Sequence, residues 1–153
     1  MRWLETRVPP PLVMLLCVAA GYLASRLWPG TVLSLPMPAL LAGGVMAIGL
    51  VLNLLPKLAF QRARTTVNPL RPSASSALVT HGVYRYTRNP MYLGQATVLA
   101  GAMLYLQNLT ALLAVPLFVL YITRLQIVPE ERALSARFPE AYAGFRQRVR
   151  RWL

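Results

Sequence analysis

Aspartate is absent from this sequence of 153 residues, and histidine and cysteine occur once each. Because His81 is the only imidazole, one chain cannot assemble a multi-histidine metal site, and we predict no bound metal. Cys17 alone cannot form an intrachain disulfide or a thiolate metal cluster. The sequence also lacks a nucleophile elbow, a phosphate-binding loop and an HExxH zinc motif. Few residues are therefore left that could carry chemistry.

Charge is scarce as well. Only 13% of residues are charged, whereas a soluble domain has about a quarter. Uncharged runs of 18, 30 and 35 residues separate Arg7 from Arg26, Arg26 from Lys57, and Arg88 from Arg124. A membrane-spanning helix needs roughly 20 apolar residues. The first run fits one span, the second fits one span with its loop, and the third fits two short spans joined by a tight hairpin. We therefore predict an all-α integral membrane protein with about four transmembrane helices.

Prolines mark the expected helix boundaries, since proline is tolerated in a first turn and disfavoured further inside a helix. Pro56 and Pro116 are expected to bend the second and fourth helices, and Pro129 is expected to follow the end of the fourth. The predicted helices cover residues 9–28, 39–60, 90–107 and 109–127. We interpret 1–153 as a single membrane domain, with two spans in 1–60 and the remaining elements in 61–153.

The net charge of +12 could indicate nucleic-acid binding. The basic residues instead flank the apolar runs, which argues against a nucleic-acid partner and for the bilayer. If the N-terminus is cytoplasmic, every basic residue except Arg26 falls on the cytoplasmic side, as the positive-inside rule predicts. We thus expect a bacterial inner-membrane protein with both termini in the cytoplasm. Cleavage as a signal peptide is disfavoured because Arg26–Pro29 is a poor cleavage site.

The C-terminal region changes from apolar to amphipathic. Tyr142, Phe145, Val149 and Trp152 recur at helical spacing among several arginines. A basic helix with an aromatic face is typical of a segment lying on an anionic membrane surface, and we predict that placement.

Two segments could form a site on the cytoplasmic face. Gly82–Gly94 is dense in arginine and tyrosine, and Glu130 and Glu131 follow the fourth span. Carboxylate and aromatic groups can hold an organic cation, and arginine can hold a carboxylate. Two simpler interpretations remain open: a juxtamembrane turn for the first segment and a salt-bridged helix start for the second. The long loop 61–89 between spans favours a functional role.

The same segments resemble the isoprenylcysteine carboxyl methyltransferase family, and phospholipid N-methyltransferases share parts of the pattern. The first matching block is Leu78-Val79-x-x-Gly82-x-Tyr84-x-x-x-Arg88-Asn89-Pro90-x-Tyr92-x-Gly94. The second is Glu130-Glu131-x-x-Leu134-x-x-x-Phe138-x-x-x-Tyr142-x-x-Phe145-x-x-x-Val149. The resemblance extends from about Thr65 to the C-terminus.

The resemblance implies an S-adenosyl-L-methionine-dependent methyltransferase that acts on a lipid-like or small membrane-accessible carboxylate, thiol or amine. The residues implied to bind the cofactor are Leu78, Val79, Tyr84, Asn89, Pro90, Met91, Tyr92 and Glu130. Those implied to be catalytic are Arg88, Glu131 and Arg124, and those implied to contact the acceptor are Arg124 and Gln126. Arg88 would balance the carboxylate of the cofactor or fix the turn.

Four positions depart from the family pattern, and one of them is Phe145, which stands where the tail motif has a second tyrosine. Asn89 stands where the family usually has histidine. An asparagine side chain can form hydrogen bonds, but it cannot take up and release a proton, so this position cannot transfer one. Pro139 replaces a usual glycine, and Gln126 stands where eukaryotic members have an arginine for the carboxylate of the substrate. The sequence therefore predicts a binding and positioning loop and leaves the acceptor open. An NADPH-dependent reductase of the sterol-reductase type and a non-enzymatic membrane scaffold remain as alternatives.

Overall fold

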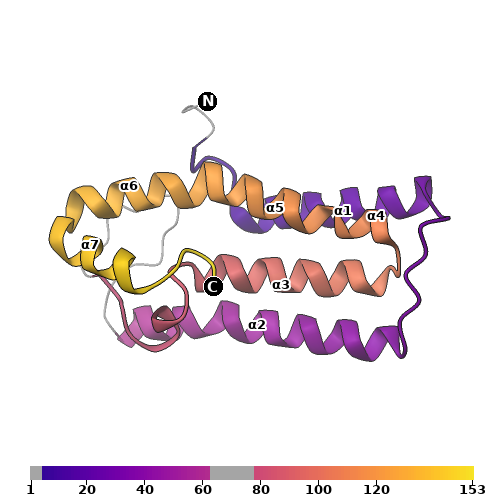
Figure 1. Cartoon of the computed structure of the whole chain (residues 1–153), viewed down its shortest axis with the longest axis horizontal. Helices are drawn as coiled ribbons and strands as arrows, with labels where there is room; N and C mark the ends of the chain where they lie inside the picture. Colours follow the sequence, from indigo (N-terminus) through magenta and orange to yellow (C-terminus); the bar gives the residue numbers. More distant parts are fainter. Residues whose placement is uncertain (1–4, 63–77) are drawn as a thin grey trace.

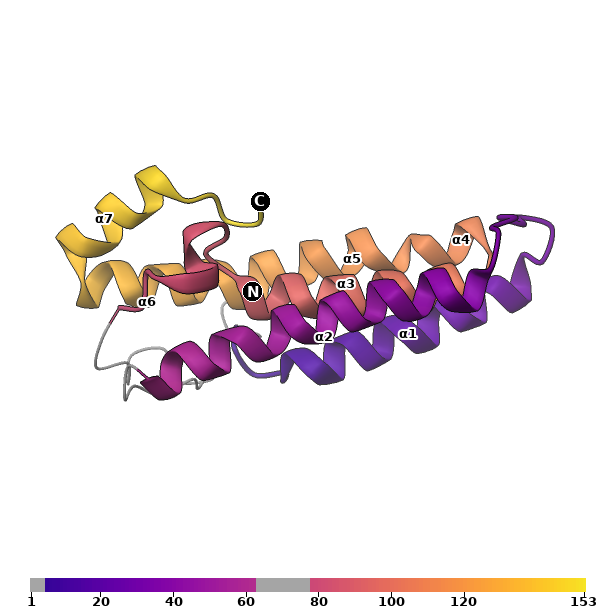
Figure 2. The same ribbon diagram turned by 90° about the horizontal axis from the view of Figure 1, so that it is seen from below.

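The computed structural model describes residues 5–62 and 78–153. The long helices lie side by side along the long axis of the molecule, and the C-terminal helices extend beyond them at one end (Figures 1 and 2). The α-helices are α1 (Pro10–Leu27), α2 (Pro38–Arg62), α3 (Pro90–Tyr105), α4 (Leu109–Leu112), α5 (Ala114–Ile122), α6 (Val128–Arg137) and α7 (Pro139–Arg148). A 3₁₀ turn, η3 (Gly82–Arg85), precedes α3, and a π-helical turn, η4 (Thr123–Ile127), joins α5 to α6.

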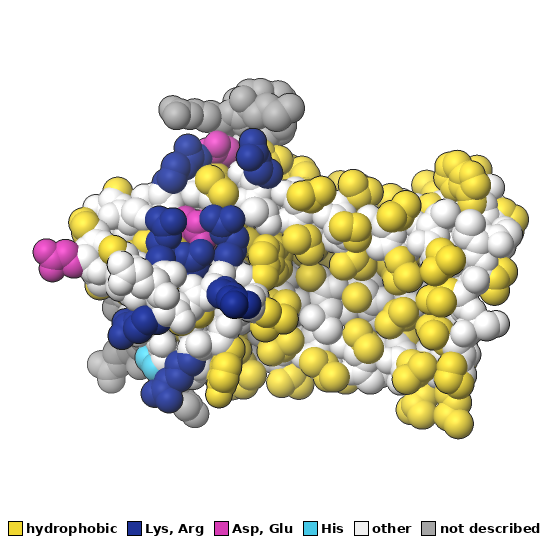
Figure 3. All heavy atoms as spheres, viewed as in Figure 1, with side chains coloured by type: hydrophobic (Ala, Val, Ile, Leu, Met, Phe, Trp, Pro, Cys, Tyr) yellow, Lys and Arg dark blue, Asp and Glu magenta, His cyan; other side chains and the backbone are white. Residues whose placement is uncertain are grey.

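The outer surface of the bundle is apolar. Leucines of α1, α2 and α5 are exposed, with Leu16 at 59% and Leu120 at 62%. Figure 3 shows one face of the molecule, on which yellow hydrophobic side chains are spread along the bundle and basic side chains gather at one end. Soluble monomers rarely expose apolar patches of this extent. Among the residues that the structure describes, three helical stretches are long and apolar enough to cross a membrane, namely Pro10–Leu27, Pro38–Leu58 and Leu109–Arg137. The chain is an all-α membrane protein, as predicted.

The predicted third span corresponds to α3, which has only 16 residues and packs along α2. Glycines allow this close approach. A Cβ atom on Gly94 would lie 2.7 Å from both the backbone nitrogen of Asn53 and the carbonyl oxygen of Gly49. A Cβ on Gly49 would lie 2.8 Å from the carbonyl oxygen of Gly94. The two backbones therefore touch at positions where only glycine fits.

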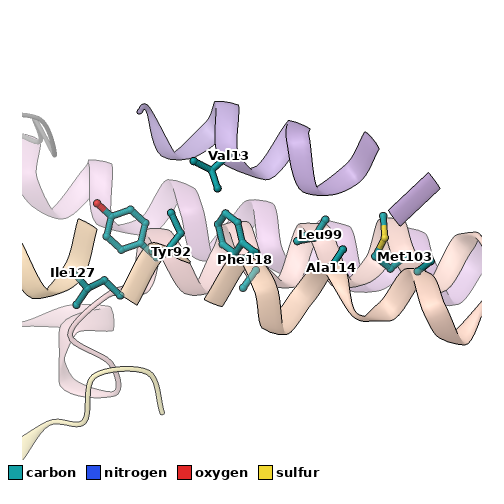
Figure 4. Close-up of a cluster of buried hydrophobic side chains, with 10 residues drawn as sticks. Val13, Tyr92, Leu99, Met103, Ala114, Phe118 and Ile127 are labelled. Atoms are coloured by element: carbon teal, nitrogen blue, oxygen red, sulfur yellow. The ribbon is translucent and has the colours of Figure 1, made fainter. Parts of the chain in front are cut away.

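The core lies between α1, α3 and α5. Leu99, Met103, Phe118 and Ile122 have no exposed surface, and Tyr92 lies at one end of the same row (Figure 4). The side chain of Tyr92 is directed so that its hydroxyl oxygen points away from Phe118. The core thus holds α3 in place and presents the hydroxyl of Tyr92 at one end of the bundle.

The prediction that the fourth helix ends near Ile127 is wrong. The helix continues for 29 residues, from Leu109 to Arg137. Pro129 has no N–H group, so it cannot bond to the carbonyl of Leu125 four residues earlier. That carbonyl instead accepts a 2.9 Å hydrogen bond from the backbone N–H of Thr6. The π-turn widens the helix just before the proline, and the freed carbonyl is satisfied by the N-terminal segment.

Candidate functional site

The candidate site lies at the end of the bundle where the basic side chains gather, which we call the polar end (Figure 3). Three segments meet there: the turn Thr87–Asn89 before α3, the first turn of α6, and the C-terminal tail 149–153. The turn and α6 are the two segments that the sequence indicated. The tail joins them.

Backbone carbonyls of the tail hold the turn before α3. The side-chain amide of Asn89 donates to the carbonyl of Arg151 at 2.9 Å, and the backbone N–H of Arg88 donates to the carbonyl of Arg150 at 3.0 Å. The hydroxyl of Thr87 donates to the carbonyl of Arg151 at 3.3 Å and accepts the backbone N–H of Asn89 at 3.1 Å. Asn89 therefore fixes the start of α3, and its amide and N–H groups have partners within the protein.

A buried carboxylate, Glu131, connects the turn, α6 and the tail. Nη2 of Arg88 lies 3.1 Å from one of its oxygens. Arg151 contacts both oxygens, through Nε at 3.1 Å and Nη2 at 2.7 Å. The Arg151–Glu131 hydrogen bonds raise the pKa of the Arg151 guanidinium. The side chain of Arg88 is only 9% exposed, and its Nε and Nη1 atoms have no hydrogen-bond partner within residues 5–62 and 78–153.

Glu130 faces a different neighbour, because consecutive helical residues point about 100° apart. Its carboxylate accepts a short hydrogen bond from the hydroxyl of Tyr92. Tyr84 is also buried nearby, and its pKa is raised by burial and by the charge of Glu130. The adjacent glutamates thus take separate roles: Glu130 faces two phenols, and Glu131 faces two guanidinium groups.

Two buried glutamines lie about one helical turn farther along the bundle. Gln95 follows Tyr92 by three residues, and Gln126 precedes Glu130 by four, so each shares the face of the helix on which its partner lies. Nε2 of Gln126 donates to the carbonyl of Val8 at 2.7 Å. The Oε1 atoms of both glutamines are buried and have no partner in the described part of the chain. Their two carbonyl oxygens can accept further hydrogen bonds.

The aromatic face of the C-terminal region does not lie on the membrane surface, so that prediction is wrong. Tyr142, Phe145 and Val149 are buried against Val79 and Tyr84, with Leu78 packed beside them. The apolar side chains that cover this face belong to residues before α3. Helix α7 therefore packs against the segment that leads into the candidate site. Burial and the charge of Glu131 raise the pKa of Tyr142 to about 12, although nearby arginines lower it.

The remaining predicted residues lie around this arrangement. Pro90 is buried at the first position of α3, and the carbonyl of Met91 accepts a 3.1 Å hydrogen bond from the amide of Asn53 in α2. Arg124 is exposed on the π-turn, whereas Gln126 of the same turn is buried. The structure thus brings together Arg88 with Glu131 and Tyr92 with Glu130, and places Arg124 at the surface.

Comparison with known proteins identifies the family. A sequence profile described as phospholipid methyltransferase matches residues 37–141, more than half of the chain. This chain belongs to the phospholipid methyltransferase family. The family is related to the isoprenylcysteine carboxyl methyltransferases, so the predicted relationship is confirmed. An uncharacterized protein of Haemophilus influenzae is 41% identical over 63 residues, which is 41% of this chain and all of that protein. No solved structure matches.

Sequence reasoning missed two residues of this membrane methyltransferase. Arg151 is one of several arginines in a basic tail, so the sequence did not distinguish the one that reaches Glu131. Gln95 could have been noticed as a polar residue in the uncharged run between Arg88 and Arg124. Polar residues inside membrane spans are costly to bury and are commonly functional.

Proposed function

We propose that this membrane methyltransferase transfers a methyl group from S-adenosyl-L-methionine to a lipid-like or small membrane-accessible acceptor. We further propose that the polar end faces the bacterial cytoplasm. The observation that carries the proposal is the partly buried Glu130–Tyr92 hydrogen bond, together with two buried glutamine oxygens that have no partner among the described residues, in a helical bundle from this family. The acceptor is a carboxylate, thiol or amine.

The residues at this end fit the cofactor. S-adenosyl-L-methionine carries an ammonium group, ribose hydroxyls and an adenine amino group, all of which donate hydrogen bonds. Glu130, Gln95 and Gln126 present acceptors, and both glutamines have a buried oxygen without a partner among the described residues. The faces of Tyr84 and Tyr92 can attract a sulfonium cation. Leu78 and Val79 would contribute apolar contacts, and the turn Asn89–Tyr92 would bound the site.

When bound, the cofactor supplies an electrophilic methyl group on its sulfonium. A carboxylate, thiolate or free amine already has the lone pair needed to receive that methyl group, so the protein need not remove a proton. Tyr92 and Glu130 would bind and orient the reactants, and the core around Phe118 would exclude water. Glu131 keeps Arg88 in place behind the turn. We keep Arg124 and Gln126 as candidates for contact with the acceptor, Arg124 from the surface and Gln126 from the interior.

Thermal unfolding in detergent tests the cofactor. We expect S-adenosyl-L-methionine and its demethylated product to stabilise the protein, by about 2.7 kcal/mol at a concentration 100 times Kd. NADPH should have no effect. Stabilisation by NADPH alone would support a reductase, and the absence of an effect from any of the three would favour a scaffold; either outcome refutes the proposal.

Variants test the site. Glu130→Gln and Tyr92→Ala should each weaken cofactor binding about tenfold or more, since the first removes the negative charge of the carboxylate and the second removes the phenol that donates to it. Glu140→Gln and Tyr105→Ala are matched controls, because both residues are exposed and lie outside the site. Equal affinity in all four variants would show that the cofactor binds elsewhere. Transfer of labelled methyl groups into a membrane extract would then identify the acceptor.

A further inference from the structure

The tail 149–153 turns back from α7 toward the bundle (Figures 1 and 2). Its two ends are held by different groups of apolar side chains. Val149 is buried in the cluster that also contains Tyr142 and Phe145. Trp152, three residues later, packs against the bundle core, to which Phe118 belongs. These apolar contacts fix the path of the tail between α7 and the bundle.

Trp152 also forms a hydrogen bond to the bundle. Its indole N–H donates at 3.2 Å to the hydroxyl oxygen of Thr123, the first residue of the π-turn η4. The same hydroxyl donates to the carbonyl of Val119 at 2.6 Å. A hydroxyl has one donor and two acceptor positions, so Thr123 can form both bonds at once. The tail is thereby tied to the start of the π-turn.

The tail contacts this helix on both sides of the π-turn. Trp152 binds Thr123 where the turn begins, and Arg151 binds Glu131 in α6, beyond the point where the turn ends. A π-turn interrupts the regular hydrogen bonds of an α-helix and is frequently found at functional sites. Two adjacent tail residues therefore bridge the irregular part of the helix, while the backbone of the tail holds the turn Thr87–Asn89.

The segments that the tail connects carry the Tyr92–Glu130 pair. Tyr92 lies in the first turn of α3, and Glu130 lies in the first turn of α6. The two helices pack little against each other, since α3 packs along α2, α1 and α5, and α6 packs against η4 and α7. A hydrogen bond weakens steeply when its atoms move apart or out of line. The relative placement of the two helix starts therefore decides whether the two side chains meet.

We propose that Thr123 and Trp152 are positioning residues for methyl transfer. They hold the π-turn against the tail and thereby set Glu130 at its place opposite Tyr92. The inference rests on the proposed function, because it takes the Tyr92–Glu130 pair to bind the cofactor. A displacement of about 1 Å, even one caused far from the reacting groups, can slow a reaction about 100-fold. The hydrogen bond between Trp152 and Thr123 should therefore affect the site as well as the stability of the fold.

The affinity for S-adenosyl-L-methionine is measured by calorimetry on the full chain in maltoside micelles, together with the thermal unfolding temperature. Trp152→Phe keeps an aromatic ring and removes the indole N–H, and Thr123→Val keeps the shape and removes the hydroxyl. Each should weaken binding about three- to tenfold, the equivalent of one hydrogen bond. Thr123→Ser keeps the hydroxyl and should bind as the wild type does.

Two matched controls carry the same changes elsewhere. Trp28→Phe alters a side chain that is 57% exposed at the end of α1. Thr97→Val removes a hydroxyl that donates to the carbonyl of Leu93 at 2.8 Å, as Thr123 does to Val119, but that has no bond to the tail. Both controls should bind S-adenosyl-L-methionine as the wild type does. Losses equal to those of Trp152→Phe and Thr123→Val would overturn the proposal.

A double-mutant cycle separates positioning from general stability. In the Glu130→Gln background the carboxylate is already absent, so Trp152→Phe should weaken binding no further. An equal loss in both backgrounds would overturn the proposal, because the effect would not pass through Glu130. Unchanged affinity in Trp152→Phe and Thr123→Val, with only a lower unfolding temperature, would show a purely structural role. No binding by the wild type would refute the proposed function and this inference together, whereas the other results refute the inference alone.

Discussion

Replacing Glu131 with glutamine removes the carboxylate that two arginines contact, at nearly constant side-chain volume. In the wild type, Arg151 contacts both oxygens and Arg88 contacts one. After the change, the Arg88 side chain, only 9% exposed, keeps its charge but loses its anionic partner. Its Nε and Nη1 atoms have no described partner even in the wild type, so they cannot compensate.

Breaking a buried ion pair by removing one partner costs about 3–5 kcal/mol, because a buried charge is left without compensation. The contribution of Arg151 should be smaller, since that side chain is 36% exposed and remains partly solvated. We therefore expect Glu131→Gln to lower the free energy of unfolding by about 3–5 kcal/mol. Arg151→Ala should lower it by no more than about 1–2 kcal/mol.

Unfolding by sodium dodecyl sulfate in mixed micelles, followed by tryptophan fluorescence, gives these free energies. Glu5→Gln is the matched control, because Glu5 is paired with Arg132, whose side chain is 49% exposed. An exposed pair of this kind contributes at most about 1 kcal/mol. If Glu131→Gln is no more destabilising than Glu5→Gln, the ion pairs of Glu131 do not stabilise the polar end, and the reasoning is refuted.

Two further predictions concern packing and ionisation. Gly94→Ala should lower the free energy of unfolding by about 1–3 kcal/mol, because the new methyl group meets the backbone of α2. Gly43→Ala has open space around it and should cost nothing in the same assay; equal effects would contradict the close helix contact. The pKa of Tyr142, raised from 10.0 to about 12, implies stability that is complete below pH 10 and is lost as the pH rises toward 12. Tyr142→Phe should therefore lose less stability than the wild type over that range, and parallel pH profiles would refute the shift.

The helices could be predicted from sequence because their ends depend on local features. Uncharged runs set their lengths, and Pro10 and Pro90 occupy first turns as expected. The end of the fourth helix could not be predicted this way. Pro129 normally argues against helix continuation, but here a π-turn and the N–H of Thr6 compensate for the missing hydrogen bond. That compensation comes from a segment distant in sequence.

Only part of the candidate site could be predicted, again because some of its contacts join segments that are distant in sequence. The two motif blocks correctly placed Arg88 and Glu131 at the same end of the bundle, where they form an ion pair. Helical spacing also identified the shared face of Tyr142 and Phe145. Spacing cannot say what covers a face, and the cover proved to be Val79 and Tyr84 rather than lipid. The hydrogen bonds that hold the turn Thr87–Asn89 to the tail are accepted by backbone carbonyls of the tail, which carry no sequence signal.

The N-terminal segment has a consequence for the order in which the protein is assembled. Glu5 pairs with Arg132, 127 residues later, and Val8 accepts the amide of Gln126, 118 residues later. Glu5 and Val8 must therefore wait until Gln126 and Arg132 have been synthesised before they find their partners. The carbonyl of Leu125, which Pro129 leaves without a helical donor, accepts the backbone N–H of Thr6 at the same stage. We expect synthesis of residues 109–153 to complete the polar end in one late step, so that a nascent chain halted before Leu109 would hold its earlier spans in the membrane but have no finished site.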